Sequence, residues 1–168
     1  MGKKKNILAF IVISAFGTLL HFVYDWSGEN PIVALFSAVN ESVWEHQKLL
    51  FVAAAVYSLI EYLTACKRVY NYPIAAAIGI ITAIISVITL FYTYSGILGF
   101  SITFIDISLY FVGVLIYLIV RNIIIKNNYF GSGTANTVGY LMIIVLGIFF
   151  AVWTFYPLKI SLFIPEMR

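Results

Sequence analysis

Five long apolar stretches, separated by short polar segments, make up most of the sequence. Each stretch is close to the ~20 residues that an α-helix needs to cross the hydrocarbon core of a bilayer. The segments between them are rich in the glycine, proline, asparagine and serine residues that are typical of turns. This pattern predicts an all-α, polytopic membrane helix bundle that forms a single domain. The predicted spans cover about residues 6–24, 48–66, 74–92, 102–125 and 137–155.

A sixth apolar segment, at about residues 31–39, is too short to cross a bilayer. It follows Asn30 and Pro31, a pair that is typical of a helix start, with asparagine as the N-cap and proline at the first helical position. We therefore expect a re-entrant or interfacial half-helix here. It leads directly into a polar cluster at residues 40–48.

Composition makes the bilayer the expected solvent. The chain has 168 residues, of which 62% are hydrophobic and only 10% are charged, whereas a soluble domain carries about 25% charged residues. The mean hydropathy is +1.01. The net charge of +3 is modest, and the basic residues lie at the ends of spans rather than in one patch, which argues against nucleic-acid binding. The single cysteine, Cys66, excludes an intrachain disulfide and a cysteine-based zinc cage.

The distribution of basic residues predicts an orientation. Cytoplasmic loops of membrane proteins carry an excess of lysine and arginine. With the N-terminus in the cytoplasm and the C-terminus outside, seven of the ten basic residues fall on the cytoplasmic side of a cell membrane. The first apolar run is too long for a secretory signal and lacks a clear cleavage site, so we interpret it as a retained span. The seven are Lys3, Lys4, Lys5, Lys67, Arg68, Arg121 and Lys126; the other three are Lys48, Lys159 and Arg168.

The polar cluster at residues 40–48 has the sequence Asn-Glu-Ser-Val-Trp-Glu-His-Gln-Lys. On a helix, Glu41, Glu45 and Lys48 would share one face, and His46 would lie on the adjacent face. His21, near the end of the first span, and Asp106, in the second turn of the fourth, are expected at the same depth. Polar groups concentrated at one level of an apolar bundle predict a polar pocket that opens to the outer face.

Two kinds of chemistry fit these residues. His21, Glu45 and His46 could bind a divalent metal, the candidate cofactor, because imidazole and carboxylate groups are its usual ligands. Alternatively, Glu45, His46 and Asp106 could act as catalytic proton carriers. The spacing matches neither the His-Glu-x2-His motif of zinc peptidases nor the Glu-x2-His motif of di-iron bundles. The residues expected to bind a ligand are Asn40, Glu41, Trp44, Lys48 and Tyr94.

Structural interpretations compete with these hypotheses. Glu41 and Lys48 could belong to a solvated first turn of a helix, and His21 could pair with Asp25. Asp106 is harder to explain by packing, because a carboxylate within the hydrocarbon costs ~2.5–3.5 kcal/mol. It should face His21, Lys48 or Tyr94.

Glu61 is a second acidic residue within a predicted span, closer to the cytoplasmic side. It lies too far along the helix to reach the outer cluster. We expect a structural ion pair with Arg68 or Arg121, although a proton path would place an acid there too.

Several short motifs together resemble a family of small prokaryotic integral membrane proteins of unknown function. The segment Asn-Glu-Ser-x-Trp-Glu-His-x-Lys at residues 40–48 is the most specific of them. The resemblance extends over nearly the whole chain and implies a multi-pass fold, but it implies no activity. The other motifs are His21-x2-Tyr24-Asp25-Trp26, Tyr92-Thr93-Tyr94-x-Gly96, Asp106-Ile107, Trp153-x2-Tyr156-Pro157 and Leu162-Phe163.

Three classes of function remain open. The first is a membrane-embedded enzyme, metal-assisted or acid/base, that acts on a lipid or another outer-leaflet substrate. The second is a component that binds or transports a cation or a small polar solute. The third is a structural or assembly partner in a membrane complex. No haem, flavin or nucleotide motif is present in the sequence.

Overall fold

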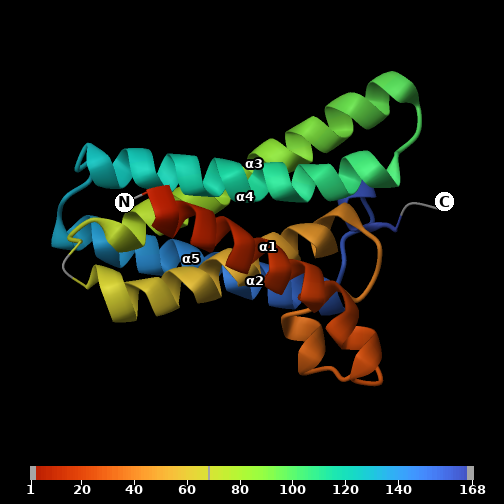
Figure 1. The fold of residues 1–168 in the computed structure, drawn as a ribbon. Coiled ribbons are helices and arrows are strands. Elements are labelled where there is room, and N and C mark those ends of the chain that lie inside the picture. The colour runs from red at the N-terminus through yellow and green to blue at the C-terminus, as the bar shows by residue number, and fades with distance from the viewer. Residues whose placement is uncertain (1–2, 68, 166–168) are drawn as a thin grey trace.

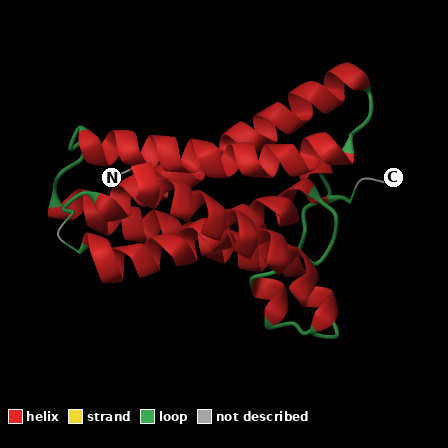
Figure 2. Ribbon diagram, viewed as in Figure 1, coloured by secondary structure: helices red, strands yellow, loops and turns green. Residues whose placement is uncertain are grey.

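The computed structural model describes residues 3–67 and 69–165. Within these residues the chain is helical without strands (Figure 2), and five helices are long and apolar enough to cross a membrane, which confirms the predicted fold class. Arg68 and Arg168, which entered the prediction of orientation, lie outside the described residues. The five helices are α1 (Lys3–Trp26), α2 (Val43–Glu61), α3 (Tyr72–Leu98), α4 (Thr103–Lys126) and α5 (Gly133–Phe155).

The five helices run alternately up and down the bundle (Figure 1). α1, α3 and α5 finish at one end, where α2 and α4 begin. We call this the histidine end, because His21 and His46 lie there. α3 and α4 pack against each other as a long hairpin, and towards the histidine end this hairpin diverges from α1 and from the loop that follows it (Figure 1).

α3 continues to Leu98, beyond the end expected near Tyr92. The polar residues after Tyr92 do not stop the helix, because their hydroxyl groups are satisfied within it. Thr93 Oγ1 donates to the carbonyl of Thr89 at 2.7 Å, and Ser95 Oγ donates to the carbonyl of Phe91 at 2.7 Å. Gly99 then ends the helix in the left-handed conformation, with a φ of 80°.

The segment at residues 31–39 is a compact turn, where the sequence suggested a half-helix. Only Val33–Leu35 forms a helical turn, the 3₁₀ helix η1. Polar side chains bind backbone groups on either side of it: Asn30 Oδ1 accepts from Ile32 N at 2.9 Å, and Ser37 Oγ donates to the carbonyl of Leu20 in α1. Local bonds of this kind compete with helix formation and hold the segment against α1.

Small residues allow α2 and α3 to pack closely in the centre of the bundle. Ala53, Ala54, Ala75 and Ala83 are all fully buried, and small side chains let helix backbones approach one another in membranes. α5 lies at the periphery and leaves most of its apolar side chains exposed, as lipid contact requires. After Glu61, α2 continues into a π-helical segment, η2 (Tyr62–Cys66).

A buried ion pair lies at the end of the bundle opposite the histidine end. Arg121 Nη1 is 2.8 Å from Glu61 Oε2, and the Tyr72 hydroxyl donates to the same oxygen at 2.6 Å. Arg121 also donates to the Tyr117 hydroxyl at 3.2 Å. Glu61 therefore has the structural ion-pair partner that the sequence suggested, and the partner is Arg121.

Replacing Gly139 by alanine is expected to lower the free energy of unfolding by about 1–3 kcal/mol. A Cβ atom at Gly139 would lie 2.7 Å from the backbone N and Cα of Ile74, so α3 and α5 would have to separate. Thermal unfolding in detergent measures the loss. Gly147→Ala in the same helix is the matched control, because its Cβ would meet the Phe51 ring at 3.4 Å. Equal losses in the two variants would contradict this explanation.

Replacing Arg121 by methionine is expected to destabilise the protein by about 3–5 kcal/mol, because it leaves the Glu61 carboxylate buried without a counter-charge. Adding Glu61→Gln to that variant removes the uncompensated charge and should recover much of the loss. Denaturant unfolding of the two single variants and the double variant measures the coupling. Additive losses would show that the two side chains do not stabilise each other.

Candidate metal site at the histidine end

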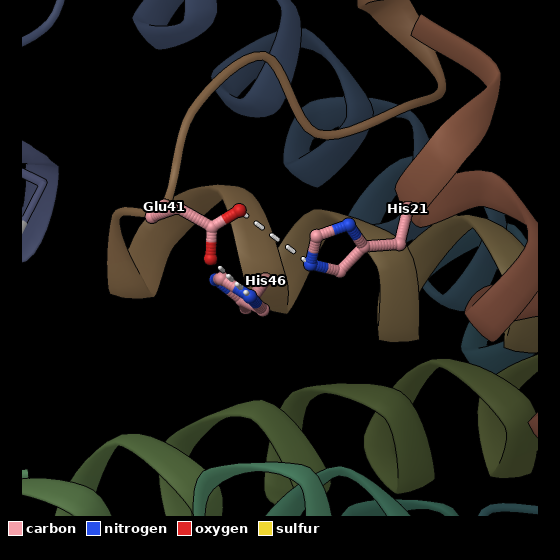
Figure 3. Close-up of side chains that lie close together, drawn as sticks. All are labelled: His21, Glu41 and His46. Atoms are coloured by element: carbon pink, nitrogen blue, oxygen red, sulfur yellow. Dashed lines mark ion pairs between the residues drawn. The ribbon is translucent and has the colours of Figure 1, made fainter. Parts of the chain in front are cut away.

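Three side chains from separate segments converge at the histidine end. His21 comes from α1, Glu41 from the loop before α2, and His46 from the first turns of α2 (Figure 3). His21 Nε2 lies 3.7 Å from Glu41 Oε1, and His46 Nε2 lies 3.7 Å from Glu41 Oε2. One ligand atom from each of the three lies within 4.8 Å of the other two. The carboxylate therefore bridges two imidazoles.

The backbone holds the His46 ring in one orientation. His46 Nδ1 lies 2.9 Å from the carbonyl oxygen of Ser42. Because a carbonyl oxygen can only accept, Nδ1 carries the hydrogen and the neutral ring keeps its lone pair on Nε2, which faces Glu41. Metal-binding histidines almost always donate their other ring N–H in this way.

A helix cap explains why Glu41 and Glu45 point in different directions. Ser42 is the N-cap of α2, and its Oγ accepts from the backbone N of Glu45 at 3.3 Å. Asn40 Oδ1 accepts from the backbone N of Ser42 at 2.9 Å and shapes the turn before the cap. Glu41 therefore precedes the helix, and the two glutamates do not share the face that a continuous helix would give them.

Glu45 lies on the side of α2 that faces α5 and η1. Its Oε2 is 2.5 Å from Lys48 Nζ and accepts from Val39 N at 3.0 Å, while its Oε1 accepts from Thr154 Oγ1 at 2.9 Å. Lys48 Nζ also donates to the carbonyl of Ala34 at 2.7 Å and to Thr154 Oγ1 at 2.9 Å. Both charged groups are buried. Through Ala34 and Thr154, the pair links α2 to η1 and to α5.

The remaining predicted residues have separate positions. Trp44 is buried against Phe150 and Trp153 of α5, with ring centroids 4.3 and 5.1 Å away. The Tyr94 hydroxyl donates to Asp106 Oδ1, and Tyr94 is one of the partners expected for that carboxylate. The structure thus brings together His21 and His46 from the predicted metal ligands and Glu41 from the predicted binding residues. Glu45 lies outside this cluster, and the chemical roles assigned to all these residues stay predictions.

A cavity of about 250 Å³ lies beside the cluster, between α1, α2, α3 and α4. Its polar groups are those of His21, Glu41, His46, Gln47 and Asp106, together with the hydroxyls of Thr18, Thr103 and Tyr110. The rest of the lining is largely apolar and includes Leu50, Val87, Phe91 and Leu109. The cluster therefore meets a space with both a polar and an apolar part.

Glu41 was misplaced in the sequence analysis, because the helix was assumed to include this residue already. The spacing of Glu41 and Glu45 made them equivalent on a helix. The order Ser42-x-x-Glu45 is the capping-box signature of a helix start. Applied to the sequence, it would have placed Glu41 outside the helix and Glu45 in its first turn. No comparable pattern in the sequence indicated that Thr154 bonds to Glu45 or that Gln47 lines the cavity.

Two imidazoles and one carboxylate form the ligand set of several catalytic zinc sites, in which a further position stays open to water or substrate. Ligand atoms about 2.1 Å from a tetrahedral zinc lie ~3.4 Å apart. The two distances of 3.7 Å run to different oxygens of Glu41, and one ligand atom from each residue lies within 4.8 Å of the other two, so the ligands would have to move closer together around a zinc ion. The donor types and the orientation of the His46 ring fit a divalent cation such as Zn²⁺.

Comparison with known proteins provides a family but no function. No curated protein and no solved structure matches the chain. The model of a family of unknown function, DUF6512, matches residues 1–168, and the chain therefore belongs to that family.

Proposed function

We propose that the protein is a membrane-embedded enzyme that binds a divalent metal through His21, Glu41 and His46 and acts on a lipid or similar substrate in the adjacent cavity. The observation that carries this proposal is the convergence of the three ligand groups at the cavity, with His46 Nε2 facing Glu41. A bound metal would supply Lewis acidity that polarises a carbonyl or phosphoryl oxygen of the substrate.

Asp106 is the proposed proton carrier. It lies on α4 and lines the same cavity as the cluster, and its Oδ1 accepts a hydrogen bond from Tyr94. A carboxylate oriented by a phenol can accept a proton from a reacting hydroxyl or water. Much of the lining beside it is apolar, and polar interactions are stronger in surroundings of low dielectric constant.

Glu45 and Lys48 have a positioning role in this proposal. Their buried ion pair connects the start of α2 to Val39 and Thr154, and the neighbouring residue, His46, contributes to the cluster. The pair would therefore hold the imidazole in place without contacting the metal.

The transport hypothesis gains less support. A route from the cluster to Glu61 would have to pass along α2, where residues 49–54 are apolar and buried. These side chains belong to the central core, together with Val114 and Tyr117 of α4. An apolar core between the two polar centres counts against a hydrated path between them.

The proposed location is the cell membrane of a prokaryote, with the histidine end on the outer face and the start of α1 in the cytoplasm. The family resemblance supports the prokaryotic source. The distribution of basic residues supports the orientation. Five spans also place the start of α1 and the end of α5 on opposite faces.

The first test is metal content. Full-length protein purified with a histidine-free affinity tag is expected to bind about one Zn²⁺ per chain, as measured by elemental analysis and titration. His46→Ala and Glu41→Gln should each weaken binding by more than about 100-fold, because each removes one of three ligands. Lowering the pH from 8 to 5 should also weaken binding, because a protonated imidazole cannot coordinate a metal.

Two control variants separate the cluster from its neighbours. Asp25→Asn changes an exposed acid near His21 and should retain the metal. Glu45→Gln should lower stability, because Lys48 loses its counter-charge, and should weaken metal binding less than His46→Ala or Glu41→Gln does. The enzyme is tested with a long-chain p-nitrophenyl ester, whose hydrolysis should require the metal and fail in Glu41→Gln. Equal metal content in wild type and His46→Ala would exclude the site.

The orientation is tested with single introduced cysteines in a Cys66→Ala background. Glu29→Cys lies in the exposed loop after α1, and Lys126→Cys lies at the opposite end of the bundle. In intact cells a membrane-impermeant maleimide should label position 29 and leave position 126 unlabelled until the cells are opened. The reverse pattern would place the histidine end in the cytoplasm.

A further inference from the structure

A groove of about 230 Å³ lies at the end of the bundle opposite the histidine end. One wall comes from α2 and η2, and the other comes from α5. The start of α3 forms the floor, since Tyr72 and Ala76 are each only 1% exposed. Val56 and Leu59 of α2 and Ile143 of α5 add apolar surface to the two walls.

The polar side chains in the floor and in the α2 wall bond within the protein. Ser58 Oγ donates to the carbonyl of Ala54 and shares a hydrogen bond with the Tyr117 hydroxyl, each 2.6 Å long. The Tyr72 hydroxyl donates to Glu61 Oε2 at 2.6 Å. These groups belong to the buried network around Glu61, so the groove offers an apolar surface to an occupant.

The groove faces the hydrocarbon of the bilayer. On one wall Leu59 is 56% exposed, and on the other wall Tyr140 is 42% exposed. Both walls belong to helices that are long and apolar enough to span a membrane, so their exposed faces contact lipid. An acyl chain is the apolar group that such a groove meets first.

The groove has a deep end and a shallow end. From Ala55 to Tyr62 the helix rises by about 10 Å along the bundle. Three tyrosine rings meet at the shallow end: the Tyr62 centroid lies 5.8 Å from that of Tyr72 and 6.4 Å from that of Tyr140. Tyrosine is enriched where the bilayer meets water. An acyl chain in the groove would therefore point towards Ala55 and place its head group beyond Tyr62.

The charges at this end have one sign. Among the described residues, Glu61 is the acidic residue at this end, and it is paired with the buried Arg121. Lys67 directly follows η2, whose first residue, Tyr62, lines the groove. Clusters of basic residues next to a span attract anionic lipid head groups. The exposed charged side chains at this end, among those described, are Lys3, Lys4, Lys5, Lys67 and Lys126.

We infer that the groove between α2, α3 and α5 binds one acyl chain of an anionic phospholipid whose phosphate lies at Lys67. The apolar lining selects the chain, and the excess of lysine selects the negative head group. The bilayer is the source of the lipid. This site is separate from the cavity at the histidine end and does not depend on the function proposed for that cavity.

Photolabelling tests this inference on the full-length protein in phosphatidylcholine nanodiscs. The probe is a phosphatidylglycerol with a diazirine in one acyl chain, and adducts are mapped by mass spectrometry. Adducts are expected on Leu59 and Ile143, and replacing part of the phosphatidylcholine by unlabelled phosphatidylglycerol should reduce them. A phosphatidylcholine probe with the same diazirine chain should label these positions at least about 5-fold less. Ile119 and Ile123, exposed on α4 towards the same end, report non-specific lipid contact and should show no such preference.

Matched variants test the two parts of the site separately. Val56→Trp fills the groove from an exposed position in its wall and should abolish the preferential adducts on Ile143. Ile143→Trp fills it from the other wall and serves if Val56→Trp does not fold, with Leu59 as the reporter. Lys67→Gln should reduce the preference for phosphatidylglycerol about 5-fold, because it removes the charge next to the groove. Lys126→Gln removes an equally exposed lysine after α4 and should leave the preference unchanged.

Three results would overturn the inference. The first is equal labelling of the groove by the two probes, which would indicate ordinary bilayer contact. The second is an equal loss of preference in Lys67→Gln and Lys126→Gln, which would indicate a general attraction to the basic end. The third is a groove free of adducts in nanodiscs that contain two chains, which would indicate that a second copy of the protein covers it.

Discussion

A buried pair of opposite charges determines how the histidine end is built. Neither Glu45 nor Lys48 can lose its partner without leaving a charge in an apolar interior, which costs several kcal/mol. The groups that complete their coordination, Ala34, Val39 and Thr154, are consequently fixed around them. The first turn of α2 is held between η1 and α5. This turn places Glu41, which lies just before it, and His46, which lies within it.

Much of this architecture could be read from the sequence because it follows from hydropathy. Apolar runs of the length of a bilayer specify spans, and intramembrane acids imply partners, as the Tyr94–Asp106 and Glu61–Arg121 contacts illustrate. The residues of the cluster were harder to predict, because they depend on the position at which α2 begins. Moving a helix start by a few positions changes which glutamate leaves the helical face. Periodicity alone does not determine that start, whereas the hydrogen bond from Glu45 N to Ser42 Oγ does.

The bundle separates its two polar centres by their surroundings. Around Glu61, Arg121, Tyr72 and Tyr117 are buried and bonded to one another. At the histidine end the cluster is partly exposed, and a cavity lies beside it. At one end of the bundle, the polar groups around Glu61 bond to one another. At the histidine end, the cluster has potential ligand atoms that can contact a bound ion or molecule. Function is expected where ligand atoms remain available.

The length of α3 has a consequence for depth in the bilayer. Its 27 residues correspond to ~40 Å, whereas the hydrocarbon core is ~30 Å thick. The helix must tilt, or its tip must extend into the head-group layer. Exposed aromatic residues next to that tip, Phe100 in the loop after α3 and Phe104 at the start of α4, suit the boundary between head groups and acyl chains. The hairpin forms one wall of the cavity, so a tip that extends into the head-group layer would bring the cavity close to that layer.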